Sequence, residues 1–161
     1  MNTINGIIFK EMLRSGAANL SNHQKEVDAL NVFPVPDGDT GTNMSMTFQS
    51  GVKDALACQS DKIGDVAKAL SRGLLMGARG NSGVITSQIF RGFYQAVADK
   101  AEINTEEIAA AFENGARVAY KAIMKPVEGT ILTVIREASE VLLKKVEEDW
   151  NMQKCFEVLL Q

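Results

Sequence analysis

The segment from Asn31 to Asn43 divides the chain and reads Asn-Val-Phe-Pro-Val-Pro-Asp-Gly-Asp-Thr-Gly-Thr-Asn. Its two prolines restrict the backbone on the approach, while its two glycines permit backbone angles that other residues resist. Helical patterns lie on both sides of this segment but do not run through it. We call residues 31–43 the first loop, because packing alone does not explain its polar residues.

Two acidic residues in the first loop favour a metal site. Asp37 and Asp39 are separated by one glycine, so both carboxylates can point into the same small volume. That crowding is unfavourable unless a cation lies between them. Mg²⁺ is commonly held by one or two carboxylates together with substrate phosphates. Thr40, Thr42 and Asn43 follow directly and offer hydroxyl and amide groups at the start of a predicted helix, where anions bind.

An ordinary surface turn, with a threonine or asparagine capping the next helix, accounts for Pro-Asp-Gly-Asp equally well. An EF-hand does not. Counting from Asp37, the twelfth position is Phe48 where a bidentate glutamate is required, and the sixth position is Thr42 where a glycine is required. The residues themselves therefore leave the turn and the metal loop open.

Composition predicts one domain over residues 1–161, since 161 residues with 45% hydrophobic content suffice for a single core. A net charge of −3 argues against nucleic acid as the main partner. The lone histidine, His23, is interpreted as a solvated surface residue, and Cys58 and Cys155 are too far apart for a CxxC motif. We find no signal peptide and no apolar run of transmembrane length, so we expect a cytoplasmic protein without a transmembrane segment.

Apolar residues at helical spacing predict an all-α fold, and no segment shows the alternation typical of strands. A stripe formed by Met44, Phe48, Val52 and Ala55 predicts the helix after the first loop. Thr3 is the expected N-cap of the first helix, and Asn104 with Glu107 forms a capping-box pattern. The expected helices cover residues 3–22, 44–55, 61–76, 82–99, 104–124, 130–146 and 151–160.

Two further glycine-containing loops separate these helices. The second loop, residues 77–83, reads Gly-Ala-Arg-Gly-Asn-Ser-Gly and favours a phosphate cradle in which Asn81 or Ser82 caps the next helix. A plain turn with a serine cap is the alternative, and Arg79 either neutralises phosphate or is solvated. The third loop, residues 124–130, ends with Gly129 and with Thr130 as the expected cap. Antiparallel helices place alternate connections at the same end, so the three loops should lie together.

These motifs, in this order, resemble the N-terminal ATP-binding domain of bacterial fatty acid kinase. That domain is related to the nucleotide-binding L subunit of dihydroxyacetone kinases, the DAK2 domain family. The resemblance covers nearly the whole chain. It implies an antiparallel helical barrel that binds ATP at one end through two Mg²⁺ ions. Family members continue with further helices, so the chain is expected to be an N-terminal part that lacks the last helices of the barrel.

The resemblance also implies roles for single residues. Asp37 and Asp39 match the metal ligands at the catalytic centre. Asn31 lies one position further from this pair than the third aspartate of the dihydroxyacetone kinase relatives, and it is a candidate metal ligand through its amide oxygen. The nucleotide contacts implied for the three loops are Thr40, Gly41, Thr42 and Asn43, then Gly80, Asn81 and Ser82, then Gly129 and Thr130.

The reaction implied is transfer of the ATP γ-phosphoryl group to a fatty-acid carboxylate that a separate acyl-binding protein presents. Contacts to that partner are expected in domains outside this chain, and a homodimer is left open. Two other functions remain: the ATP-binding subunit of a dihydroxyacetone-type kinase, and a regulatory module that binds nucleotide without turnover. A purely structural helical bundle would leave the three loops unexplained.

Overall fold

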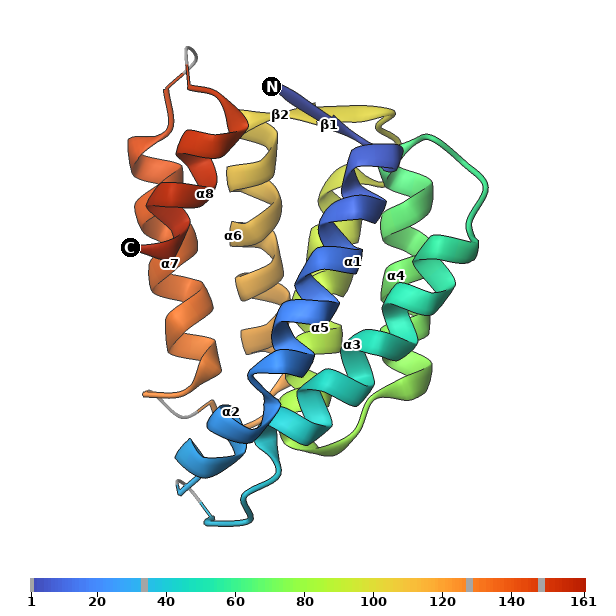
Figure 1. Ribbon diagram of the computed structural model, residues 1–161. Helices are drawn as coiled ribbons and strands as arrows, with labels where there is room; N and C mark the ends of the chain where they lie inside the picture. The colour runs from blue at the N-terminus through green and yellow to red at the C-terminus, as the bar shows by residue number, and fades with distance from the viewer. Residues whose placement is uncertain (1, 33–34, 127–128, 148–149) are drawn as a thin grey trace.

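The protein is described by a computed structural model that covers residues 2–32, 35–126, 129–147 and 150–161. The predicted all-α fold is confirmed, with eight helices and two very short strands in these ranges (Figure 1). In chain order the elements are β1 (Thr3–Asn5), α1 (Gly6–Asn22), α2 (Gln24–Leu30), α3 (Thr40–Ala57), α4 (Ile63–Gly77), α5 (Gly80–Val97), β2 (Glu102–Asn104), α6 (Thr105–Ala122), α7 (Ile131–Lys145) and α8 (Met152–Leu160).

Consecutive long helices pack side by side from α3 to α7, and α1 packs against α3 and α4. Because neighbours in this series run in opposite directions, the connections alternate between the two ends of the molecule (Figure 1). The first loop, the second loop and the start of α7 lie at the end that carries α2. The strands lie at the opposite end. The expectation that the three loops share one end is therefore confirmed.

The N-terminal residues differ from the prediction. Residues Thr3–Asn5 form a strand that pairs antiparallel with Glu102–Asn104, and Ile4 lies opposite Ile103 with both side chains fully buried. Helix α1 therefore begins at Gly6, and its N-cap is Asn5 rather than Thr3. The Asn5 side chain accepts a hydrogen bond from the Ile8 N–H at 3.0 Å. Local spacing could not reveal this pairing, because its partner lies far along the chain.

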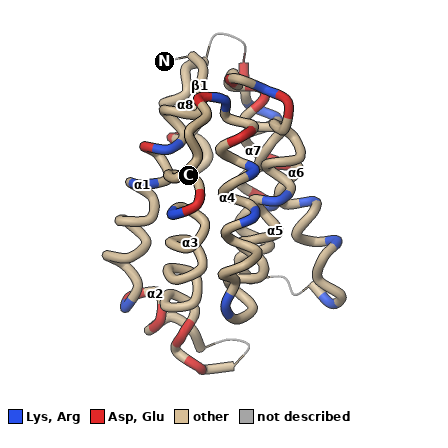
Figure 2. The backbone as a smooth tube through the Cα atoms, turned by 90° about the vertical axis from the view of Figure 1, so that its right-hand side faces the viewer, with Lys and Arg blue, Asp and Glu red and all other residues tan. Residues whose placement is uncertain are grey.

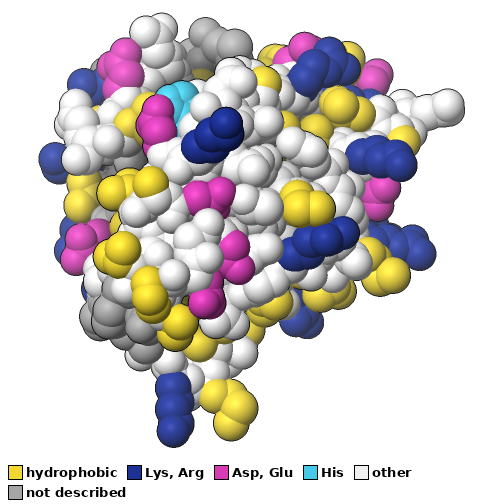
Figure 3. Space-filling view, turned by 60° about the horizontal axis from the view of Figure 1, so that its bottom comes forward, with side chains coloured by type: hydrophobic (Ala, Val, Ile, Leu, Met, Phe, Trp, Pro, Cys, Tyr) yellow, Lys and Arg dark blue, Asp and Glu magenta, His cyan; other side chains and the backbone are white. Residues whose placement is uncertain are grey.

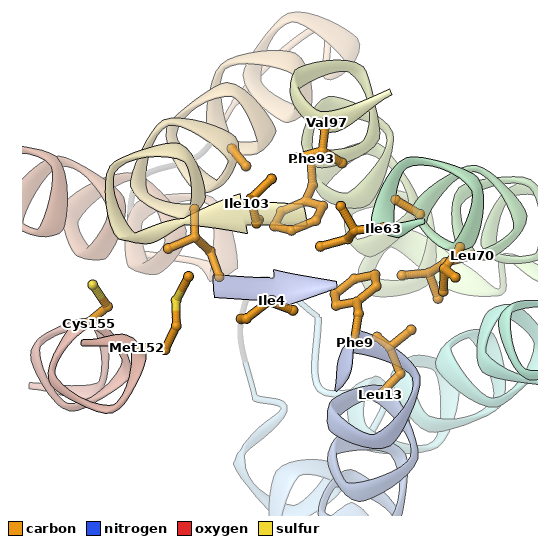
Figure 4. Packing of buried hydrophobic residues seen from close by; sticks show 14 of the residues in the cluster. Ile4, Phe9, Leu13, Ile63, Leu70, Phe93, Val97, Ile103, Met152 and Cys155 are labelled. Atoms are coloured by element: carbon orange, nitrogen blue, oxygen red, sulfur yellow. The ribbon is translucent and has the colours of Figure 1, made fainter. Parts of the chain in front are cut away.

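A row of aromatic rings crosses the core. Phe9 of α1 stacks on Phe93 of α5 with ring centroids 5.5 Å apart, and Phe93 meets Phe112 of α6 edge-on at 5.4 Å. In Figure 4, Phe9, Phe93 and Ile63 point toward one another from α1, α5 and α4. Aromatic pairs of this kind add to the free energy of area burial. These aromatic contacts thus join α1, α5 and α6 in the core. The polar residues of the three loops lie outside this row of rings, at the end that carries α2.

Two of the predicted caps are present. Asn104 and Glu107 form the capping box, and the Thr130 side chain caps α7. Asn151, expected only as the start of the last helix, also caps α8. The predicted apolar stripe of α3 is buried at Val52 and Ala55 but only half-buried at Met44 and Phe48. His23 is exposed, as predicted, between α1 and α2. In the described ranges, no helix combines the length and the apolar composition that crossing a bilayer requires.

Candidate functional site

One cavity of about 550 Å³ lies at the loop end, and all three loops line it. Its apolar side is formed by residues such as Val27, Met44 and Ile85. Most of the residues that the sequence singles out are brought together on its wall. They are Asn31, Asp37, Asp39, Thr40, Asn43, Gly80, Asn81, Ser82, Gly129 and Thr130.

Acidic side chains gather at this end of the molecule. Figure 2 shows Asp and Glu along α2 and the loop below it, and Figure 3 shows acidic side chains beside hydrophobic ones on the face that contains the first loop. Asp37 and Asp39 are both exposed. Within the described ranges, no three His, Cys, Asp or Glu side chains form a metal-binding group. A cation held by Asp37 and Asp39 would therefore take further oxygen ligands from elsewhere, as Mg²⁺ does from phosphates.

Asn31 ties the two ends of the first loop together. Its amide oxygen accepts hydrogen bonds from the backbone N–H groups of Asp39 at 3.1 Å and Thr40 at 3.2 Å. Its amide nitrogen donates to the Val35 carbonyl at 3.3 Å. A carbonyl oxygen has two lone pairs, and here both face N–H donors. Asn31 thus shapes the loop, and its role as a metal ligand stays a prediction. Pro34, expected to stiffen the loop, lies outside the described residues.

The start of α3 is capped by an acidic residue of α2. Asp28 accepts hydrogen bonds from the Thr42 hydroxyl at 2.6 Å and from the Thr42 N–H at 2.8 Å. These bonds, the hydroxyl bond first, hold the pKa of the Asp28 carboxyl below its ordinary value, and a bond from the Gly41 N–H acts in the same direction against the effect of burial. A negative charge at a helix N-terminus is also favoured by the helix dipole.

Two predicted nucleotide contacts face α2 instead of the cavity. Gly41 is buried, and a Cβ there would overlap the carbonyl oxygen of Gln24. The Thr42 hydroxyl donates to Asp28 and accepts from the Gln24 amide at 3.1 Å. Neither residue lines the cavity. In this structure both join α3 to α2, because a glycine allows the close approach and a threonine supplies the hydroxyl.

The second loop leads directly into α5, which begins at Gly80 rather than at Ser82 as predicted. Glycine is favoured at position 80 for two reasons: its φ is 64°, and a Cβ there would overlap the Asn43 side-chain amide. No described side chain caps α5. The first N–H groups of a helix have no acceptor within it, so those of Gly80, Asn81 and Ser82 are available. The Ser82 hydroxyl donates to the Thr40 carbonyl at 3.3 Å and joins the first two loops.

The third loop closes the cavity on the α7 side. Gly129 has φ 80°, and its N–H donates to the Thr133 hydroxyl at 2.8 Å. The Thr130 hydroxyl accepts from the Leu132 N–H at 3.3 Å, which is the predicted cap. Each of the three loops contributes one glycine with positive φ, and the described ranges contain no others.

Sequence reasoning missed Asp28 and Thr47. The fully buried Thr47 hydroxyl accepts from the Arg79 N–H at 3.0 Å and so holds the second loop against α3. A signal for Asp28 existed, because an acidic residue in the last turn of a helix opposes that helix's own dipole and usually has another partner. Arg79 is exposed and lines a separate hollow beside Lys53, so its side chain is not on the wall of the main cavity.

Comparisons with known proteins agree with this architecture. Residues 34–161 match the DAK2 domain. The chain is 55% identical over 150 residues to protein YloV of Bacillus subtilis, covering 93% of this chain and 27% of YloV. It is 53% identical over 156 residues to an uncharacterized protein of Staphylococcus haemolyticus, covering 97% of this chain and 28% of that protein. An uncharacterized protein of Staphylococcus aureus is 51% identical with the same two coverages.

The chain thus spans little more than a quarter of the length of these curated relatives. The domain match includes the acidic pair and the second and third loops, while Val27, Leu30 and Asn31, which also line the cavity, precede the matched residues. The all-α fold and the domain match together assign the chain: it belongs to the DAK2 domain family.

Proposed function

We propose that this chain is the Mg²⁺·ATP-binding domain of a kinase that phosphorylates a fatty-acid carboxylate presented by a separate acyl-binding protein. One observation carries the nucleotide part of the proposal: all three glycine-containing loops line a single cavity of about 550 Å³. Sites for cofactors commonly have volumes of roughly 300–1,000 Å³. The fatty-acid part rests on the resemblance of the loop sequences to fatty acid kinase.

The residues on the cavity wall fit this ligand. Asp37 and Asp39 offer exposed carboxylates, which are the hard oxygen donors that Mg²⁺ takes. The start of α5 offers uncapped N–H groups, which suit phosphate oxygens. Val27, Met44 and Ile85 offer an apolar wall for the remainder of the nucleotide.

In the proposed reaction, Asp37 and Asp39 would hold two Mg²⁺ ions, with Asn31 as a candidate third ligand. Bound Mg²⁺ would neutralise charge on the phosphate oxygens during transfer. The N–H groups of Gly80, Asn81 and Ser82 would orient the phosphates, with Thr40 and Asn43 beside them on the cavity wall. A carboxylate acceptor is already ionised at neutral pH, so the transfer needs no general base.

A second candidate is the nucleotide-binding subunit of a dihydroxyacetone-type kinase, because the DAK2 domain match favours that class. A third is a regulatory domain that binds nucleotide without turnover. The chain spans little more than a quarter of its curated relatives, so the acceptor and the partner belong to the proposal.

Calorimetry tests the nucleotide part. The chain is titrated with ATP in the presence of Mg²⁺ and again with EDTA in excess. We expect saturable binding with Mg²⁺ and much weaker binding with EDTA. Binding in neither condition would overturn the proposal.

A transfer assay tests the acceptor. The full-length protein is incubated with Mg²⁺ and radiolabelled ATP, together with an acyl-binding protein loaded with oleate. A parallel reaction contains dihydroxyacetone and its carrier subunit. Acyl phosphate formation supports the first function, dihydroxyacetone phosphate formation supports the second, and nucleotide binding without either product supports the regulatory domain.

A further inference from the structure

Helix α2 has seven residues, and none of them is buried. A helix this short is unstable on its own, and without buried side chains it gains little from hydrophobic burial. Yet Val27 and Leu30 of α2 line the cavity, and Asn31 at its C-terminal end begins the first loop. The position of α2 therefore shapes one wall of the candidate site, and polar contacts must hold it in place.

The contacts that hold α2 converge on the first turn of α3. Asp28 accepts from both the hydroxyl and the N–H of Thr42, at 2.6 and 2.8 Å. The Gln24 amide donates to the same hydroxyl at 3.1 Å. At Gly41 the backbones of the two helices approach so closely that no Cβ fits between them. Asp28 supplies the one charged group in this set, and hydrogen bonds to a charged group are the stronger ones.

We propose that Asp28 is a positioning residue that fixes α2 and the first loop against the start of α3 and thereby holds Asp37 and Asp39 toward the cavity. Both ends of the segment that carries Asp37 and Asp39 are held in this arrangement. Asn31, at the start of the segment, accepts hydrogen bonds from the N–H groups of Asp39 and Thr40 at its end. The proposal rests on the proposed function of the cavity as a Mg²⁺·ATP site. It assigns to Asp28 no contact with nucleotide or metal, since Asp28 does not line the cavity.

The proposal separates two effects of replacing Asp28. A residue that only stabilises the fold would lower the melting temperature and leave the affinity of the folded protein unchanged. A positioning residue would in addition raise the Mg²⁺ concentration needed for ATP binding, because the metal ligands lose their common orientation. The Mg²⁺ concentration at half-saturation, measured on folded protein, is therefore the informative readout.

Asp65 provides a matched control. It lies in the first turn of α4 and accepts from the Ser60 hydroxyl at 2.6 Å, which is a similar contact between a hydroxyl and a carboxylate. The start of α4 lies at the opposite end of the molecule from the first loop (Figure 1). Asp65→Asn thus removes a comparable charged contact at a helix start without touching the cavity.

The experiment compares wild type, Asp28→Asn, Asp28→Ala and Asp65→Asn by calorimetry with ATP at a series of Mg²⁺ concentrations, with circular dichroism to verify folding. We expect the half-saturating Mg²⁺ concentration to rise about tenfold in Asp28→Ala and about threefold in Asp28→Asn, in which the amide oxygen can still accept from the Thr42 N–H. Asp65→Asn should stay within about twofold of wild type. If Asp28→Ala does not fold, the isosteric Asp28→Asn decides the question.

Equal Mg²⁺ dependence in folded Asp28→Asn and Asp65→Asn would overturn the proposal and leave the proposed function intact. Absence of Mg²⁺-dependent binding in wild type would instead overturn the proposed function itself.

A double-mutant cycle tests the route through Thr42. Thr42→Val keeps the side-chain shape and removes the hydroxyl that Asp28 binds. If Asp28 acts through Thr42, Asp28→Asn should change the Mg²⁺ dependence less in the Thr42→Val background than in wild type, because coupled residues are not additive. Fully additive effects would show that Asp28 and Thr42 act independently and would overturn this part of the proposal.

Discussion

Helices α3 and α5 both begin at the end of the molecule that carries the cavity, but their first turns differ. At α3, the N–H groups of Thr40 and Thr42 donate to Asn31 and Asp28, so the chain supplies its own acceptors. At α5, no described side chain caps the first turn, and Gly80, Asn81 and Ser82 line the cavity. The first N–H groups of any helix need a partner. The comparison indicates that α3 is anchored by the protein, while α5 is open to a ligand.

The largest expected effect concerns the acidic pair beside the α3 start. Asp37→Ala or Asp39→Ala should lower Mg²⁺-dependent ATP affinity by about 100-fold or more, because the one carboxylate that remains does not neutralise the cation. Circular dichroism should show unchanged helicity, since both side chains are exposed. Calorimetry measures the affinity, and wild-type affinity in both variants would refute their assignment as metal ligands.

Two glycine substitutions should have different effects at the starts of α3 and α5. Gly41→Ala should destabilise the protein by about 1–3 kcal/mol, because its Cβ meets the Gln24 backbone and α2 must move away. Gly80→Ala should cost about 1–3 kcal/mol of backbone strain at positive φ and should also weaken ATP binding in the folded protein.

Urea denaturation measures the stability of both glycine variants, and calorimetry measures their affinity for ATP. If Gly80→Ala leaves the affinity unchanged, the start of α5 is not a phosphate site.

A pair of hydroxyl deletions, with smaller expected effects, compares the start of α5 with a helix start far from the cavity. Ser82→Ala should weaken nucleotide binding by about 1–2 kcal/mol if its hydroxyl meets phosphate, since hydrogen bonds to charged groups have this magnitude. Ser60→Ala, which removes a hydroxyl bonded to Asp65 at the far end, is the matched control and should leave the affinity unchanged. Equal affinity in both variants would show that the Ser82 hydroxyl does not bind phosphate and serves only its contact with Thr40.

The smallest effect is the pH dependence of the α3 cap. The bonds from Thr42 hold the pKa of Asp28 below its ordinary value in the folded protein. The stability that they provide is therefore complete above the unfolded-state pKa of about 4 and is lost as the pH falls through the lower folded-state pKa. Melting temperatures of wild type and Asp28→Asn should differ at neutral pH and converge in acid. A constant difference down to about pH 2 would contradict this.

Local patterns predicted much of the site. The spacing of apolar residues indicated the long helices, and the glycines indicated the breaks that became the three loops. The capping box at Asn104 and the cap at Thr130 were also readable, because each depends on residues a few positions apart. The alternation of helix direction then sufficed to place the three loops at one end.

The direction in which each side chain of those loops points was not readable. Gly41 and Thr42 follow the acidic pair directly, yet they face α2, while Thr40 and Asn43 beside them face the cavity. Adjacent residues of a helix point about 100° apart, so which of them meets a ligand depends on which neighbour packs on each side. The β1–β2 pairing escaped prediction for a similar reason, since strands of three residues show no pattern of their own.

The amino-acid sequence alone determined the long helices, the breaks between them and the order of the motifs. The helices and the breaks follow from interactions between residues near one another in sequence. The cap that Asp28 provides for α3, the anchor that Thr47 provides for the second loop, and the uncapped start of α5 emerged only once the helices were packed. The two contacts join segments that are distant along the chain, and the start of α5 lacks such a contact. A hydrogen-bond partner supplied by a distant segment leaves no local signature.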